Sequence, residues 1–303
     1  MTKRGDAGTP PDNRFLVPIE YPAPQPYAVD SDLAAACRER ARRLRAQLEP
    51  GDAILVEPPF VIAGKLTEAE LAEWHREVIL PAAAAMRASY FTRPPDAPVT
   101  LILLGDEPSY LRYAGRLAGE PALDYFGYYD SGQRTAVANL AAGEGTLLHE
   151  LTHALMEFDF PQAPEWFAEG LASLHEQCRL RRDGLELVGL DNWRGDELRT
   201  SVAEGRLPSL DRLVATGGFR GDEQARNYAH ARFLLLFLQS RGDLRTFYRS
   251  FRDRSVEDPT GLAILKELVE PVSREPLDRS FRRWIARWQT SDVPPSAETA
   301  QEG

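Results

Sequence analysis

The chain has 303 residues but few of the features that mark membrane, secreted or thiolate-metal proteins. Its only two cysteines, Cys37 and Cys178, form no CxxC pair, so the sequence predicts neither a disulfide framework nor a thiolate zinc site. No apolar run approaches the roughly 18 residues of a membrane span. The N-terminal residues also lack the apolar stretch of a secretory signal. We therefore expect a cytoplasmic protein with two buried free thiols and no membrane partner.

Basic charge is in the minority as well. The chain has 36 Lys and Arg residues against 46 Asp and Glu residues, which gives a formal net charge of -10. An acidic protein does not attract phosphate backbones or anionic lipids without a dedicated basic patch. We therefore expect no nucleic-acid partner. The hydrophobic fraction of 43% and the charged fraction of 27% are ordinary for a globular protein that buries a core.

Hydrophobic periodicity and proline content divide the chain into four parts. Residues 1–30 contain six prolines and predict an extended arm. Residues 31–180 mix strand and helix patterns, residues 181–288 are mostly helical, and residues 289–303 form a flexible tail. The expected fold class is α+β, with a mixed first half followed by a helical half.

Turn residues bound the strand patterns. Two strands, 125–129 and 135–140, are expected on either side of a turn at Asp130-Ser131-Gly132. Residues 53–61 predict one strand that two prolines interrupt. Among the helices, one is expected to start at Thr67 with a capping box.

The residues that carry chemistry are His149-Glu150-Leu151-Thr152-His153, an HExxH motif that uses two of only five histidines. Chance alone gives about 0.01 such matches in a chain of this composition. On a helix, the i,i+4 spacing puts both imidazoles on one side, where one divalent ion can bind both. Glu150 is rotated by about 100° from the first histidine and can act as general base toward a metal-activated water.

A catalytic zinc site needs about three protein ligands, and two downstream acids compete for the third place. Glu169 lies on the next expected helix, after a proline-rich breaker at 160–164, and a helix hairpin can fold it back onto the metal. Asp159 stands where an HExxHxxGxxH pattern places its last ligand, but Met156 occupies the glycine position of that pattern. Glu169 is therefore favoured, and Asp159 is expected to be a surface acid at the end of the helix.

The pair HELTH and PEWFAEGLA resembles the gluzincin clan of zinc metallopeptidases, especially its small bacterial peptidase-MA-like members. In that group a Trp-x-x-Glu-Gly motif on a helix delivers the glutamate ligand. The resemblance is specific over residues 99–178 and looser to about residue 288. It implies a zincin-like catalytic domain with a mixed sheet and active-site helices, followed by a helical subdomain that closes the active-site cleft.

The same resemblance implies roles for individual residues. His149, His153 and Glu169 correspond to the zinc ligands, and Glu150 corresponds to the catalytic base. Ser173 stands where thermolysin-like members have an aspartate that accepts a hydrogen bond from a ligand histidine. A serine accepts that bond more weakly.

Gluzincins also use a tyrosine or histidine downstream of the glutamate ligand to stabilise the oxyanion of the tetrahedral intermediate. Tyr228 is the favoured candidate, and His230, two residues later, is the second. For each, the structural alternative is a polar group at the edge of a core helix.

The expected function is hydrolysis of peptide bonds with one zinc ion per chain. Seven Asp or Glu residues and no Lys or Arg lie between residues 135 and 178, a charge that favours a cation. The strand at 135–140, just before the metal helix, is expected to be a sheet edge that pairs with an extended peptide or protein substrate. The alternative from another class is a zinc-stabilised binding or scaffold protein without turnover.

Overall fold

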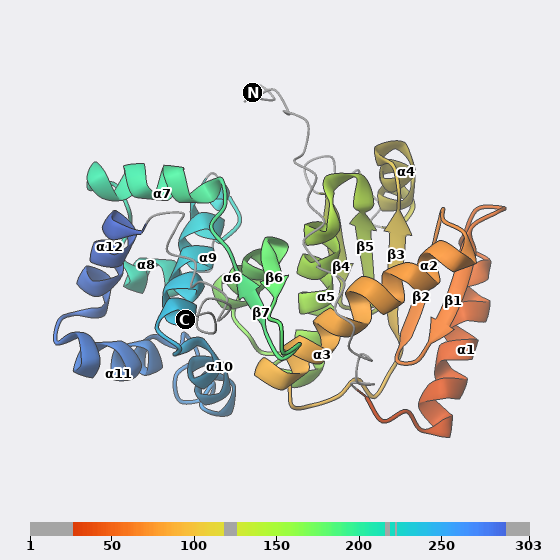
Figure 1. The fold of residues 1–303 in the computed structure, drawn as a ribbon, viewed down its shortest axis with the longest axis horizontal. Helices are drawn as coiled ribbons and strands as arrows, with labels where there is room; N and C mark the ends of the chain where they lie inside the picture. The colour runs from red at the N-terminus through yellow and green to blue at the C-terminus, as the bar shows by residue number, and fades with distance from the viewer. Residues whose placement is uncertain (1–26, 118–125, 216–218, 222, 289–303) are drawn as a thin grey trace, which may run out of the picture.

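The computed structural model describes residues 27–117, 126–215, 219–221 and 223–288, and its fold is α+β, as expected (Figure 1). A five-stranded sheet with helices on both faces forms one half, and a group of helices around a central helix forms the other. Most of the expected N-terminal arm and all of the expected tail lie outside the described residues.

The larger sheet is mixed, with strands β1 (Ala53–Glu57), β2 (Phe60–Gly64), β3 (Val99–Leu104), β4 (Gly127–Asp130) and β5 (Thr135–Asn139). Their order across the sheet is β1-β2-β3-β5-β4. The inner strands β2, β3 and β5 run parallel, and each outer strand runs antiparallel to its neighbour.

The expectation that residues 135–140 form a sheet edge is wrong. β5 pairs with β3 on one side and with β4 on the other, and all five of its residues are buried. The expected turn after Asp130 does join two strands, but the first of them, β4, takes the outer place. A substrate therefore cannot pair with β5, and the edge on this side of the sheet is β4.

Residues 53–61 also differ from the expectation of one interrupted strand. They belong to a hairpin, β1 and β2, in which Pro58 and Pro59 form the turn and Glu57 pairs with Phe60. The peptide bond between the two prolines is cis. Proline has no N–H group to donate to a strand partner, so a proline pair ends one strand more readily than it interrupts it.

Side chains alternate between two cores along the inner strands. In β3, Ile102 and Leu104 face the core under the helices α1 (Ser31–Arg45) and α4 (Glu107–Leu117). Leu101 and Leu103 face the core under the helices of the other face. Both faces are thus buried, which explains why these strands are mostly apolar instead of alternating with polar residues.

The helices of this second face come from two segments. The first contains α2 (Glu68–Trp74), a π-helical turn (His75–Ile79) and α3 (Leu80–Ser89), and the second is α5 (Glu144–Asp159). The capping box at Thr67 is confirmed, because the Thr67 side chain accepts from the Glu70 N–H while the Glu70 side chain accepts from the Thr67 N–H. The expected buried free thiols are confirmed too.

The helical half packs against α5 through α6 (Glu165–Glu176). Its remaining elements are β6 (Cys178–Leu180), β7 (Leu187–Gly189), α7 (Arg194–Ala203), α8 (Leu210–Val214), α9 (Gln224–Ser240), α10 (Leu244–Asp253), α11 (Leu262–Ser273) and α12 (Leu277–Arg287). α6 lies between α5 and the buried helix α9 (Figure 1). A Cβ atom at Gly170 would be only 3.2 Å from the Ala231 backbone, so the missing side chain lets α6 and α9 approach closely.

One hydrophobic core runs from the sheet into the helical half, through residues of α5, α6 and α9. This shared core fixes α5 and α6 relative to each other. Among the described residues, none of the helices combines the length and the apolar character that crossing a membrane requires.

Candidate metal centre

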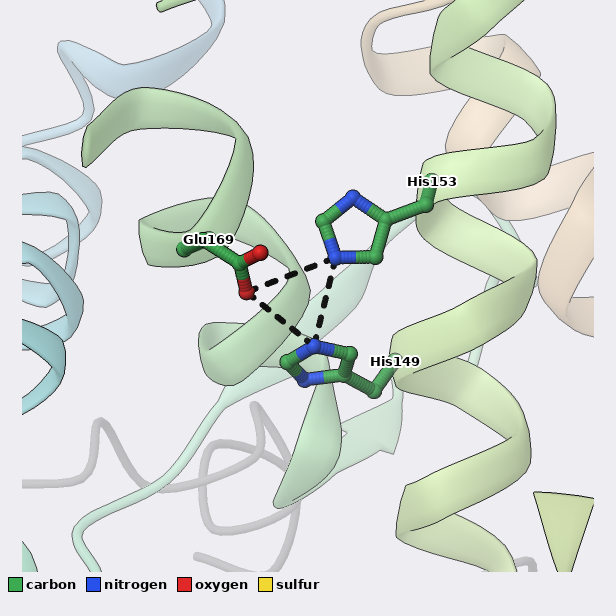
Figure 2. Close-up of side chains that lie close together, drawn as sticks. All are labelled: His149, His153 and Glu169. Carbon is green, nitrogen blue, oxygen red and sulfur yellow. Dashed lines mark hydrogen bonds and ion pairs between the residues drawn. The ribbon is translucent and has the colours of Figure 1, made fainter. Parts of the chain in front are cut away.

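The helix α5 carries both histidines of the HExxH motif on one side. Leu147, Leu151 and Leu155 anchor the helix in the core at exposures of 1% or less. The imidazoles of His149 and His153 project from the opposite side of the same helix, and their Nε2 atoms lie 3.2 Å apart (Figure 2). The i,i+4 spacing thus brings the two rings together, as the sequence predicts.

Glu169 reaches the two histidines from the neighbouring helix. The breaker ends α5 at Asp159 and α6 begins at Glu165, so the chain reverses between them. The Oε2 atom of Glu169 lies 3.4 Å from His149 Nε2 and 3.5 Å from His153 Nε2 (Figure 2). The three residues form the one group of potential metal ligands found among the described residues.

The spacing of these three atoms fits a tetrahedral metal site. Ligand atoms placed about 2.0 Å from a zinc ion at the corners of a tetrahedron are about 3.3 Å from one another. The observed separations of 3.2, 3.4 and 3.5 Å agree with this value. Glu169 is only 4% exposed, and its Oε2 atom has no hydrogen-bond donor within the described part of the chain. Two imidazole nitrogens and one carboxylate oxygen are a ligand set that zinc accepts.

The other oxygen of Glu169 has a partner that the sequence did not reveal. Arg220 donates from a terminal guanidinium nitrogen to Glu169 Oε1 at 2.5 Å, and from its Nε to Glu165 Oε1 at 2.6 Å. Arg220 lies in the segment before α9, 51 residues beyond Glu169. No local sequence pattern predicts a contact between residues this far apart along the chain.

For Glu150 and for Glu169, burial raises the pKa and the neighbouring histidines lower it. Burial raises the pKa of Glu150 to about 8, partly offset by the charge of His153. For Glu169, burial alone would also raise the pKa, but the close imidazoles of His149 and His153 outweigh it and lower the pKa well below the usual range. Glu169 is therefore an anion suited to a cation, and Glu150 is a buried carboxyl group whose charged form needs a nearby cation.

Glu150 lies against the edge strand β4. It is 6% exposed, and a Cβ atom at Gly127 would be 2.9 Å from Glu150 Oε1 and 2.6 Å from Thr146 Cγ2. Only glycine leaves room for Glu150 at this place. The sheet edge and the expected base are thus in direct contact.

The two oxyanion candidates point in different directions from α9. The ring of Tyr228 packs 5.1 Å from the ring of Phe219, and its hydroxyl interacts electrostatically with Arg220, so Tyr228 faces the side of α9 where Glu169 lies. The ring of His230 instead stacks on Phe281 of α12 at 5.5 Å and 14°. His230 is therefore part of the packing within the helical half, and it is not among the clustered ligands.

Asp159 is not a surface acid, contrary to expectation. It is fully buried at the end of α5 and accepts hydrogen bonds from the backbone N–H groups of Thr92 and Arg93, both at 2.7 Å. Tyr248 and Arg252 donate to its other oxygen, each at 2.9 Å. These partners occupy the carboxylate and tie the end of α5 to α10.

Two further residues of α6 are buried beneath the cluster. The hydroxyl of Ser173 has no hydrogen-bond partner within the described residues, so in this structure it does not support a ligand histidine. His175 lies five residues beyond Gly170, and its Nδ1 atom is 2.9 Å from the hydroxyl of Thr152. Burial lowers the pKa of His175 to about 3, which keeps its ring neutral. The contact between Thr152, which belongs to the HExxH motif, and His175 therefore joins α5 to α6.

Comparison with known proteins adds no relative. No protein-family model matches the chain, and no curated protein matches it. The gluzincin resemblance therefore rests on the two motifs and on the way their residues meet.

Proposed function

We propose that the protein is a zinc metallopeptidase with a zincin-like catalytic domain of the gluzincin type. The observation that carries this proposal is the triangle of His149 Nε2, His153 Nε2 and Glu169 Oε2, with sides of 3.2 to 3.5 Å. Two ligands come from one helix and the third from the next, as in the clan that the motifs resemble. The three residues would hold one zinc ion per chain.

A zinc ion bound there would supply a Lewis acid, which polarises a peptide carbonyl and lowers the pKa of water. Glu150 takes the proton from the attacking water on its carboxylate and passes it to the departing amine. Burial raises the pKa of Glu150 to about 8 in the site without a cation, and the charge of a bound zinc ion would lower that pKa and keep the carboxylate ionised, as a base requires. A tyrosine hydroxyl from Tyr228 would donate a hydrogen bond to the oxyanion.

A substrate peptide would pair with the edge strand β4 instead of with residues 135–140, the strand expected from the sequence. β4 ends the strand order of the sheet, and its Gly127 contacts Glu150. A peptide in extended conformation that pairs with a sheet edge presents its backbone in register with that edge. Pairing at β4 would therefore bring the scissile bond toward Glu150, which favours a peptide or protein substrate.

The position of Glu150 also separates an enzyme from a zinc-stabilised scaffold. A structural zinc site has four closed ligands and does not need an additional buried acid. Here three ligands are clustered, and a buried carboxyl group of raised pKa lies beside them. This arrangement favours turnover over a purely structural site.

The test is a pair of measurements on wild type and Glu150→Gln. Wild type should cleave members of a broad peptide library, and Glu150→Gln should lose at least about 1000-fold in kcat while keeping its zinc. A zinc-loaded wild type that cleaves no peptide would support the scaffold alternative. Equal rates in the two proteins would remove Glu150 from the mechanism.

A further inference from the structure

The two carboxylate oxygens of Glu169 have different neighbours, and Arg220 contacts one of them. Its guanidinium donates to Oε1 at 2.5 Å, whereas Oε2 faces the two histidines at 3.4 and 3.5 Å. A carboxylate can bind a metal ion through one oxygen or through both. With Oε1 held by the arginine, Oε2 is the oxygen that faces the two histidines and the metal position.

A second acid holds the arginine in place. Glu165 begins α6 and lies one helical turn before Glu169, so the two carboxylates are on the same side of the helix. Arg220 bridges them, with its Nε bonded to Glu165 and a terminal nitrogen bonded to Glu169. The planar, multidentate guanidinium is suited to this geometry, because one rigid group can satisfy two carboxylates at fixed positions.

We propose that Arg220 is a positioning residue that fixes Glu169 as a one-oxygen metal ligand and so keeps a coordination position open. This inference rests on the proposed zinc site. A ligand held through both oxygens would take the place that water and substrate need in a four-coordinate catalytic site. Arg220 would thus act on the metal through Glu169, without touching the metal or the substrate.

Charge and geometry predict opposite effects of removing Arg220. A cation next to a metal site repels the metal, so an arginine that acted only through its charge would weaken metal binding. Hydrogen-bond partners that orient a metal ligand instead strengthen metal binding, typically by 10- to 100-fold. The direction of the change in zinc affinity therefore distinguishes the two roles.

The experiment measures zinc affinity by chelator competition in the full chain for wild type, Arg220→Met and Arg220→Lys. Both variants should bind zinc about 10-fold more weakly. Methionine removes the hydrogen bonds to both glutamates, and lysine keeps the charge but cannot bridge them. Arg254→Met is the matched control. Arg254 also bonds a glutamate, Glu267, at 2.6 and 2.9 Å, and its side chain is 43% exposed, against 51% for Arg220. It should bind zinc like wild type.

A spectroscopic readout separates positioning from a general loss of structure. Cobalt(II) replaces zinc in the same proteins, and its visible absorption is strong in four-coordinate sites and weaker when a fifth ligand binds. Arg220→Met should show weaker cobalt bands than wild type, because Glu169 is then free to bind through both oxygens. Arg254→Met should keep the wild-type spectrum.

The outcomes distinguish this inference from the proposed function. A wild type that binds no zinc overturns the metal site itself. A wild type that binds zinc, with unchanged or tighter binding in Arg220→Met and an unchanged cobalt spectrum, overturns the role of Arg220 and leaves the metal site intact.

Discussion

Replacing Asp159 with Asn is expected to destabilise the fold by about 3 kcal/mol, the lower end of the cost of breaking a buried ion pair. The Asp159 carboxylate is fully buried and bonded to Arg252, whose side chain is only 14% exposed. It also accepts from Tyr248 and from the backbone N–H groups of Thr92 and Arg93. Asn keeps one oxygen for the backbone donors but turns an NH₂ group toward the guanidinium, so Arg252 loses its buried anionic partner and keeps only the exposed Asp253.

The same substitution predicts a pH dependence with a definite sign. Burial alone would raise the pKa of Asp159, but hydrogen bonds from Arg93, Arg252 and Tyr248 and the charge of Arg252 outweigh it and lower the pKa. A carboxyl group whose folded-state pKa is depressed stabilises the fold above its unfolded-state pKa, which is about 3.9 for Asp. The stability difference between wild type and Asp159→Asn should therefore be constant near neutral pH and shrink as the pH falls below about 4.

Urea denaturation at pH 7 and at pH 3.5 measures both effects. Asp253→Asn is the matched control, because Asp253 bonds the same Arg252 at 2.9 Å but its side chain is 63% exposed. That control should change the free energy of unfolding by no more than about 0.5 kcal/mol. A cost below about 1 kcal/mol for Asp159→Asn, or a cost that does not fall at the lower pH, would refute the role assigned to the buried carboxylate.

Three further predictions concern the metal site and its support. Glu169→Ala should lower zinc affinity by at least about 100-fold, whereas Asp159→Asn should leave it near wild type in chelator competition, because only Glu169 meets the histidines. The reverse order would assign the third ligand to Asp159. Tyr228→Phe should lower kcat by about 100-fold with a similar KM and unchanged zinc content, and an unchanged kcat in steady-state assays would assign the oxyanion to another group. Arg232→Met should lower the free energy of unfolding by about 3 kcal/mol in thermal or urea denaturation, because buried Arg232 donates to the backbone oxygens of Leu174, Gln177 and Leu190. A decrease within about 0.5 kcal/mol, the size of a surface change, would mean that these oxygens find other donors.

The parts of the site that sequence could predict are those that local spacing determines. His149 and His153 lie four residues apart on one helix, and the breaker between 160 and 164 returns Glu169 within one helix hairpin. The capping box at Thr67 is equally local, because its two hydrogen bonds span three residues. Patterns that span only a few residues can be identified directly from the sequence.

The parts that sequence could not predict depend on long-range packing. Arg220 meets Glu169 across 51 residues, and Asp159 meets Tyr248 across 89. The strand order is equally non-local, since nothing within residues 135–139 specifies that β4 takes the outer position. The wrong expectation for Asp159 assumed that the end of a helix lies at the surface, and the wrong expectation for the sheet edge relied on the position of residues 135–140 just before the metal helix.

A crystal structure of the zinc-soaked protein, measured at the zinc absorption edge, would show whether His149, His153 and Glu169 together hold one metal ion. We expect a single anomalous peak per chain, bonded to Nε2 of each histidine and to Oε2 of Glu169 at about 2.0 to 2.2 Å. A peak elsewhere, or zinc bound to the two histidines with Glu169 still turned toward Arg220 alone, would contradict it.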